Sequence, residues 1–300
     1  MNFQSEADIC GELLKIAKTG QLYRGSKPIM WSPVEQTALA EAEVEYKDKK
    51  ATQIYVKFPV REFLPVTNMG EVIDSMRVKR GAQALNDDDQ EATNKALNFI
   101  QDASVVIWTT TPWTIPANRA VSFSSKIKYG LYKITEMEES EFEPWSKLGD
   151  KLIVADDLWP AVAKAGLIKA AERLQEIEGS SLENVILNHP LKNMADSEGK
   201  YDFPVPLLEG SHVTADAGTG FVHTAPSHGE DDYVVWISNQ KKLEGLGIDP
   251  IVPMTLDDAG CYTDIMPTRF QGLDVIRTSG KKRGQDGLSL IHISEPTRPY

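Results

Sequence analysis

The sequence contains few cysteines and no long apolar run. Cys10 and Cys261 stand far apart, so they form neither a disulfide framework nor a C-x-x-C metal site, which is typical of a reducing compartment. Because no run of about eighteen apolar residues is present, we expect no transmembrane helix and no membrane partner. The first ten residues include neither a basic nor an apolar segment. We therefore expect no secretory signal and a cytoplasmic location.

Positive charge is also scarce. The chain has 32 Lys and Arg residues against 44 Asp and Glu residues, a formal net charge of −12. Because DNA is a polyanion, this balance argues against DNA binding by the chain as a whole. RNA binding through a local basic patch stays open, since net charge says little about one face. The phosphate-binding motifs G-x-G-x-x-G and G-x-x-x-x-G-K-[ST] are both absent.

The sequence does contain many short strand patterns and a few helix patterns without regular βαβ alternation, which predicts an α+β fold. We predict helices over 5–23, 156–177 and 231–243. Ser5 would cap the first helix, Gly179 would follow the second, and a capping box from Ser227 to Glu230 would open the third. We expect a polar loop with a short helix over 82–103. The predicted strands are 23–31, 54–58, 104–111, 129–134, 150–155 and the glycine-interrupted 205–224.

The first stretch with chemical potential is V-V-I-W-T-T-T-P-W-T-I-P-A-N at 105–118. Successive side chains on a strand alternate faces, so Thr109 and Thr111 would point one way and Thr110 the other. These threonine hydroxyls either form hydrogen bonds across the sheet or line a site that binds a polar substrate or a water. Trp113 is either a core anchor or a stacking wall.

The second stretch is D-A-G-T-G-F-V-H-T-A-P-S-H-G-E-D-D-Y at 216–233, where the G-T-G at 218–220 predicts a tight turn. Asp232 lies in the first turn of the predicted helix, where free N–H groups would hold it ionised and ready for an α-ammonium group. His223 and His228 could join Asp232 in a metal site. A hydrogen-bonded structural role for the histidines is the favoured reading.

Together with K-P-I-M-W-S-P-V-E-Q-T-A-L-A-E-A-E-V-E-Y at 27–46, these stretches closely resemble isoleucyl-tRNA synthetases at their inserted editing domain. The resemblance covers roughly 3–275. Leucyl and valyl relatives typically have T-T-R-P where this chain has T-T-T-P-W. The resemblance implies a β-rich, barrel-like editing domain at 47–275, and a trailing part of the α/β Rossmann-like catalytic core with its connecting ribbon at 1–46. We expect 276–300 to be a foreign, disordered tail.

The resemblance also implies a function. Such synthetases must separate isoleucine from valine, and one methylene is worth only ~1–3 kcal/mol in a pocket, a limit for which isoleucyl-tRNA synthetase is itself the standard example. A second site therefore hydrolyses valine wrongly attached to tRNA(Ile). The implied partners are the acceptor end of tRNA(Ile), the mischarged valine and the rest of the synthetase chain.

The resemblance also implies functional roles for the residues of this sequence that match the motifs of the family. His223 would block isoleucine, Asp232 would hold the α-ammonium group, and threonine hydroxyls with backbone amides would serve a positioned water and the developing oxyanion. No cofactor is implied for editing, whereas the parent enzyme uses ATP and Mg. The implied catalytic residues are Thr109, Thr110, Thr111, His223 and Asp232, and the implied substrate-binding residues are Trp113, Gly218, Thr219, Gly220 and His228.

The sequence also departs from the family. The ATP motifs H-I-G-H and K-M-S-K-S are absent, so we expect no isoleucine activation by this chain and interpret it as a fragment. Ser32 and Glu35 stand where many relatives have C-x-x-C, so no zinc is expected. Two alternatives stay open: a non-catalytic RNA-binding fragment and, less favoured, a metal hydrolase that uses His223, His228 and Asp232.

Overall fold

A computed structural model describes residues 2–22, 27–46, 48, 51–63 and 100–276. The loop predicted over 82–103 falls mostly outside the described residues, and so does the tail predicted from 276 onward. The domain boundaries predicted at 46/47 and 275/276 stay predictions.

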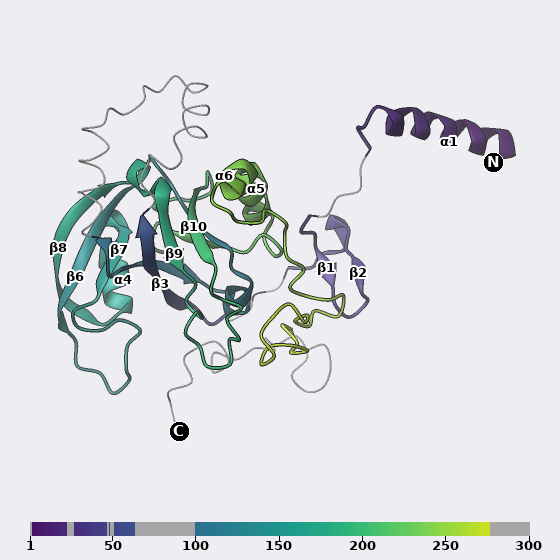
Figure 1. Cartoon of the computed structure of the whole chain (residues 1–300). Helices are drawn as coiled ribbons and strands as arrows, with labels where there is room; N and C mark the ends of the chain where they lie inside the picture. The colour runs from purple at the N-terminus through teal and green to yellow at the C-terminus, as the bar shows by residue number, and fades with distance from the viewer. Residues whose placement is uncertain (1, 23–26, 47, 49–50, 64–99, 277–300) are drawn as a thin grey trace, which may run out of the picture.

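A nine-stranded mixed sheet forms the body of the described chain, in the order β11-β5-β10-β9-β3-β4-β7-β6-β8 (Figure 1). Strands β4 and β7 pair in parallel, as do β5 and β10, and the other neighbours are antiparallel. The strands are β3 (Ile54–Phe63), β4 (Ala103–Thr109), β5 (Ala120–Phe123), β6 (Lys128–Met137), β7 (Lys151–Ala155), β8 (Ile168–Glu178), β9 (Val185–Asn188), β10 (Pro204–Glu209) and β11 (Val222–Thr224). The predicted α+β class is confirmed.

The hydrophobic core is built around the curved sheet, because the central strands of the sheet carry apolar side chains on both faces. Val105, Val106 and Ile107 of β4 are completely buried, as is Phe58 of β3. Such β-branched runs favour extended backbone and pack well in a doubly covered strand. The strands predicted at 54–58, 129–134 and 150–155 are confirmed as parts of β3, β6 and β7.

The sheet curls so that its β11 end approaches β7 and β6, which are far from β11 in the strand order. The Ala155 amide donates a hydrogen bond of 2.9 Å to the Thr219 carbonyl. The Tyr129 hydroxyl donates one of 2.8 Å to the Gly220 carbonyl. These contacts give the sheet the barrel-like curvature that was expected.

The helix predicted over 156–177 is wrong beyond its first half. After η5 (Asp156–Leu158), α4 (Trp159–Ala165) ends, and the chain reverses at Leu167, whose φ is +54°. The remaining residues form the long edge strand β8, which pairs with β6 along its whole length. The alanine- and glutamate-rich composition of 168–178 suits a helix, but pairing with β6 overrides that preference.

The helix predicted over 231–243 is split in two. Helix α5 (Glu230–Ser238) and helix α6 (Gln240–Gly245) meet at Asn239. The predicted capping box is also wrong. Gly229 is the N-cap without a side-chain hydrogen bond, because the Ser227 hydroxyl is bonded to Thr255 instead, 3.1 Å away.

The N-terminal part of the chain makes little contact with the sheet. Helix α1 (Phe3–Lys18) confirms the first predicted helix, but Asn2 rather than Ser5 caps it, and none of its residues is buried. A small ribbon follows, formed by β1 (Trp31–Ser32) and β2 (Thr37–Ala38), and then η1 (Glu41–Glu43). The strand predicted over 23–31 is wrong for its described part except at Trp31.

The remaining regular elements are η4 (Pro112–Ala117) and η6 (Gly179–Asn184). Across the described residues, no helix is long and apolar enough to cross a membrane.

Candidate functional site

The threonine stretch lies at a strand end rather than along a strand. Thr109 is the last residue of β4, and Pro112 opens η4 directly afterwards. The Thr109 hydroxyl accepts a hydrogen bond of 3.0 Å from the Thr111 amide, so it stabilises a local turn. Thr110 is exposed. The predicted alternation of three threonines is therefore wrong, because only Thr109 belongs to the strand.

The turn into η4 brings Thr114 against His223 of β11. Thr114 Oγ1 lies 2.7 Å from His223 Nε2 and 2.8 Å from the Thr111 carbonyl. The Asn118 amide nitrogen lies 2.7 Å from the Ala120 carbonyl and 3.2 Å from His223 Nδ1. Two segments that are more than a hundred residues apart in the sequence thus meet through buried polar contacts.

These contacts determine the tautomer of His223. The Asn118 amide nitrogen can only donate, so Nδ1 of His223 accepts and its proton sits on Nε2. The Nε2–H group donates to Thr114 Oγ1, and the Thr114 hydroxyl in turn donates to the Thr111 carbonyl. Both ring nitrogens are occupied, so His223 has no lone pair free for a water or a metal ion.

Burial keeps His223 uncharged. The side chain is only 8% exposed, and burial, with a smaller contribution from nearby His228, lowers the pKa of His223 to about 3. The ring is poorly suited to act as a general base, because its pKa is low and its only lone pair, on Nδ1, is engaged by the Asn118 amide. It can serve as a rigid wall that fills space.

Asp232 faces the segment that follows His223. Its Oδ2 accepts a hydrogen bond of 3.0 Å from the Ala225 amide. Burial raises the pKa of Asp232 to about 6, against the effect of the Ala225 amide and with the help of Asp231. The Ala225 amide favours the ionised form of Asp232, as expected of N–H groups at a helix N-terminus, but the loss of water outweighs this contact and the pKa rises. Asp232 is nevertheless mostly ionised at neutral pH.

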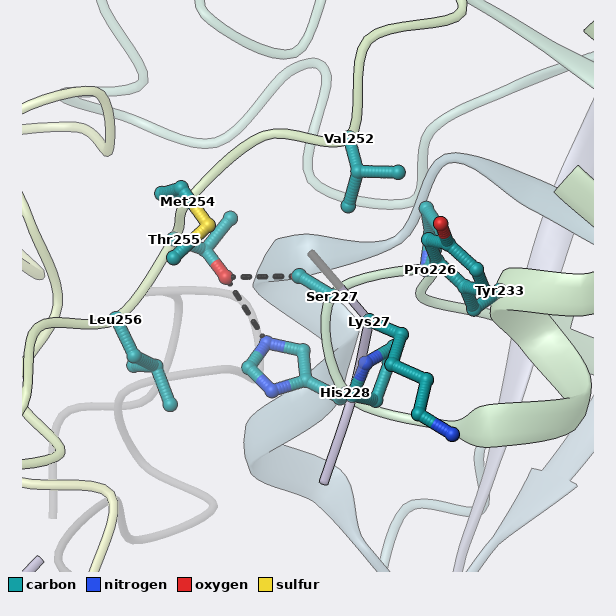
Figure 2. Close-up of a pocket in the computed structure, with 10 residues that line it drawn as sticks. Lys27, Pro226, Ser227, His228, Tyr233, Val252, Met254, Thr255 and Leu256 are labelled. Atoms are coloured by element: carbon teal, nitrogen blue, oxygen red, sulfur yellow. Dashed lines mark hydrogen bonds between the residues drawn. The ribbon is translucent and has the colours of Figure 1, made fainter. Parts of the chain in front are cut away.

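His228 lines a cavity of about 110 Å³ (Figure 2). The Trp113 and His228 rings meet edge to face with centroids 5.3 Å apart. Burial lowers the pKa of His228 to about 4, so this ring is also neutral. The cavity walls are Lys27, Pro28, Pro226, Ser227, His228, Tyr233, Val252, Met254, Thr255 and Leu256.

The G-T-G segment forms the predicted turn before β11. Gly218 and Gly220 have φ values of +82° and +80°, a region that glycine adopts without steric cost. Thr219 is buried, with its hydroxyl bonded to the backbone of Phe221. The carbonyls of Thr219 and Gly220 join this turn to Ala155 of β7 and Tyr129 of β6, which is a structural role.

The described residues contain no group of three His, Cys, Asp or Glu side chains placed to hold a metal ion. His223, His228 and Asp232 therefore do not form such a group in the described part of the chain. His223 has no free nitrogen, and His228 Nε2 is bonded to Thr255 at 2.9 Å. Ser32 and Glu35 are hydrogen-bonded to each other through their side chains.

Four residues of this region were not predicted. Thr114 and Asn118 lie within the quoted 105–118 stretch, and their polar side chains among apolar neighbours are the signal that could have found them. Thr255 and Tyr262 lie in a segment without any recognisable pattern. Only the three-dimensional contacts reveal that Thr255 bonds His228 and that the Tyr262 hydroxyl donates to the Trp113 carbonyl.

Residues 1–250 match the profile of the family described as tRNA synthetases class I (I, L, M and V). The chain belongs to this class I synthetase family. Isoleucine–tRNA ligases of Bradyrhizobium diazoefficiens and Brucella abortus are 46% and 50% identical to it, over 94% and 89% of this chain. The chain spans about a quarter of the length of these relatives, since it covers 24% of each.

Solved structures of leucyl-tRNA synthetase editing domains are similar to parts of this chain at low sequence identity. The cytosolic leucyl-tRNA synthetase editing domain of P. falciparum matches at 15% identity with a TM-score of 0.44, over 78% of this chain and 92% of that one. The corresponding domain of P. knowlesi matches at 15% identity with a TM-score of 0.40, over 66% and 65%.

Proposed function

We propose that this chain contains the editing site of an isoleucyl-tRNA synthetase, which hydrolyses the ester of valine wrongly attached to tRNA(Ile). The observation that carries the proposal is the meeting of the two motif segments through Thr114 and His223, with Asp232 held beside them by Ala225. The 46–50% identity to isoleucine–tRNA ligases supports the choice of the amino acid. The proposed partners are the acceptor end of tRNA(Ile), valine and the rest of a synthetase chain.

His223 contributes to the selectivity of the site in this proposal. A neutral ring held at both nitrogens cannot move aside without breaking two buried hydrogen bonds. Each buried polar group left without a partner costs about 1–3 kcal/mol, which is comparable with the value of one methylene. A side chain that carries the extra methylene of isoleucine would therefore be rejected, whereas valine would fit.

Asp232 supplies the charge for the α-ammonium group. Its pKa of about 6 leaves the carboxylate ionised at neutral pH, and an ammonium partner would stabilise the ionised form further. Deacylation by the chain should consequently decline as the pH falls below about 6. The measurement is kcat/KM for Val-tRNA(Ile) between pH 5 and 8.

Ester hydrolysis here requires a positioned water and donors for the developing oxyanion. The exposed hydroxyl of Thr110 and the backbone of the Thr109–Thr111 turn are the groups we assign to these tasks. His223 is excluded as the general base because both of its nitrogens are engaged. We propose that the reaction needs no bound metal, so excess chelator should leave the rate unchanged.

The deciding experiment compares deacylation of Val-tRNA(Ile) and Ile-tRNA(Ile) by the purified chain. We expect the valyl ester to be cleaved preferentially and Asp232→Ala to abolish that cleavage. Asp231→Ala is the matched control, because Asp231 is the adjacent but exposed acid. Cleavage no faster than the uncatalysed background by a folded chain would refute the hydrolase and favour a non-catalytic RNA-binding unit.

A further inference from the structure

Residues 254–263 form a short hairpin, and its first three residues, Met254, Thr255 and Leu256, line the cavity described above (Figure 2). Leu256 and Tyr262 pair in an antiparallel bridge, and the Thr263 amide donates a hydrogen bond of 3.0 Å to the Thr255 carbonyl. This hairpin lies beyond residue 250, where the match to the family profile ends. Two of its side chains nevertheless reach back to the site.

Thr255 holds the His228 ring. Its hydroxyl lies 2.9 Å from His228 Nε2 and 3.1 Å from the Ser227 hydroxyl, and both contacts are drawn in Figure 2. Thr255 is only 1% exposed. Because a hydroxyl has one proton and accepts at its lone pairs, Thr255 can satisfy both neighbours at once. The orientation of His228 therefore depends on Thr255.

Tyr262 holds the backbone of Trp113, the residue whose ring packs against His228. Its hydroxyl donates a hydrogen bond to the Trp113 carbonyl, and its side chain is buried among the core residues. Trp113 belongs to η4, the turn that also carries Thr114. One hairpin thus fixes both partners of the edge-to-face pair between Trp113 and His228.

We propose that Thr255 and Tyr262 are positioning residues that set the amino-acid selectivity of this site by holding His228 and Trp113. This inference rests on the proposed editing function. The rings that line a pocket must keep their geometry to within a fraction of an ångström to discriminate one methylene. The residues that pack behind those rings and bond to them supply this rigidity. Neither Thr255 nor Tyr262 needs to touch the substrate for this effect.

The test uses substitutions that remove one hydroxyl and little volume. We expect Thr255→Val and Tyr262→Phe each to lower the ratio of kcat/KM for Val-tRNA(Ile) over Ile-tRNA(Ile) by about tenfold, the order of one methylene's worth of discrimination. Thr255→Ser keeps the hydroxyl and should retain the ratio. Thr263→Val is the matched control, because its hydroxyl bonds only the Met254 carbonyl, away from His228 and Trp113.

A merely structural role would lower both rates together and leave the ratio intact, and that result would overturn the proposal. The ratio alone cannot decide if the wild-type chain cleaves neither ester, an outcome that counts against the proposed function. A second measurement covers that outcome: ¹⁵N NMR of the His228 ring, with and without an amide-linked valyl-adenosine. We expect Thr255→Val, but not Thr263→Val, to shift Nε2 and weaken binding of the analogue. Unchanged spectra and affinity would refute the inference.

Discussion

Asp232 combines a partly buried position with a role that requires negative charge. Burial raises its pKa to about 6, whereas an aspartate in an unfolded chain titrates near about 4. The folded state therefore binds the Asp232 proton more tightly than the unfolded state does. It follows that the folded chain loses stability as the pH rises from about 4 through 6.

Replacing this carboxylate should stabilise the protein while removing its function. We expect Asp232→Asn to raise the free energy of unfolding at pH 7.5 by about 2 kcal/mol, and the gain to shrink as the pH is lowered toward 4. Asparagine keeps an oxygen that can accept from the Ala225 amide. Urea denaturation at several pH values measures the effect.

The matched variant is Asp231→Asn, which removes an exposed charge at the adjacent position. It should change stability by less than about 0.5 kcal/mol. If the free energy of unfolding of Asp232→Asn equals that of the wild type at every pH, burial of the Asp232 carboxylate does not destabilise the fold.

For single residues, the sequence predicts which positions belong to the candidate site better than it predicts the protonation states of their side chains. The locations of His223 and Asp232 followed from the motifs, but their protonation depends on burial and on partners such as Asn118 and Ala225. Those partners come from other segments of the chain, or from backbone geometry. No local pattern reports them.

At the scale of elements, the turn before β11 offers a paired test of two glycines with the same backbone. Gly218 and Gly220 both have φ near +80°. A Cβ at Gly218 would meet only the Trp108 ring, at 3.4 Å, whereas one at Gly220 would lie 2.4 Å from the Ala155 Cβ. Gly220→Ala must therefore force β11 and β7 apart.

We expect Gly218→Ala to cost about 1 kcal/mol of unfolding free energy, which is the strain of the positive φ alone. Gly220→Ala should cost about 3 kcal/mol or more, because overpacking adds to the same strain. Chemical denaturation of the two variants gives the comparison. Equal losses would show that β11 is free to move away from β7.

The edge strand β8 depends on a polar anchor at its middle. Arg173 Nε and Nη2 donate to the two carboxylate oxygens of Asp156 at 3.0 and 2.5 Å, and the Tyr132 hydroxyl donates to Asp156 at 2.6 Å. Burial alone would raise the pKa of Asp156, but the bonds from Arg173 and Tyr132 outweigh it and lower the pKa. The anchor is thus intact at neutral pH and is lost as the pH falls through that lowered pKa.

Asp156→Asn should weaken the anchor by about 1 kcal/mol, a value kept small because Arg173 is partly exposed. We expect faster amide hydrogen exchange in 168–178 and little change elsewhere. Glu136→Gln is the control, since Glu136 pairs with Lys169 on the same two strands in an exposed position. Uniform exchange changes across the sheet would contradict a local anchor.

The same element shows where prediction from the sequence stopped. Strands β4 and β7 were predictable because their β-branched runs are buried on both faces, and β6 because it contains a buried run with two tyrosines. Strand β8 was not, because nine of its eleven residues are exposed or half-buried and its composition favours a helix. What decides its structure is the pairing with β6, together with the bond from Arg173 to Asp156.

At the scale of the whole molecule, the curvature of the sheet assembles the site. Strands β4 and β11 carry the two motif segments, and they are separated by four strands in the sheet order. The contacts of Thr219 and Gly220 with β7 and β6 bring β11 back across the sheet. The resemblance predicted this barrel-like shape, whereas strand patterns alone specify no curvature.

Helix α1 extends away from this body and buries none of its residues (Figure 1). Phe3, Ile9 and Leu13 are 89, 59 and 52% exposed. Removal of residues 1–20 should therefore leave the urea midpoint of the sheet unchanged, because no core contact is lost. It should also reduce self-association, since an exposed apolar surface promotes it.

Tryptophan fluorescence can follow this test cleanly, because all six tryptophans lie after residue 20. A longer deletion, through residue 40, provides the contrast. It removes Lys27 from the cavity wall and the hydrogen bond of 2.8 Å from Trp31 to the Asp258 carbonyl. We expect only the longer deletion to alter the hairpin that holds His228. A lower midpoint for the shorter deletion would mean that α1 contributes to the fold in solution.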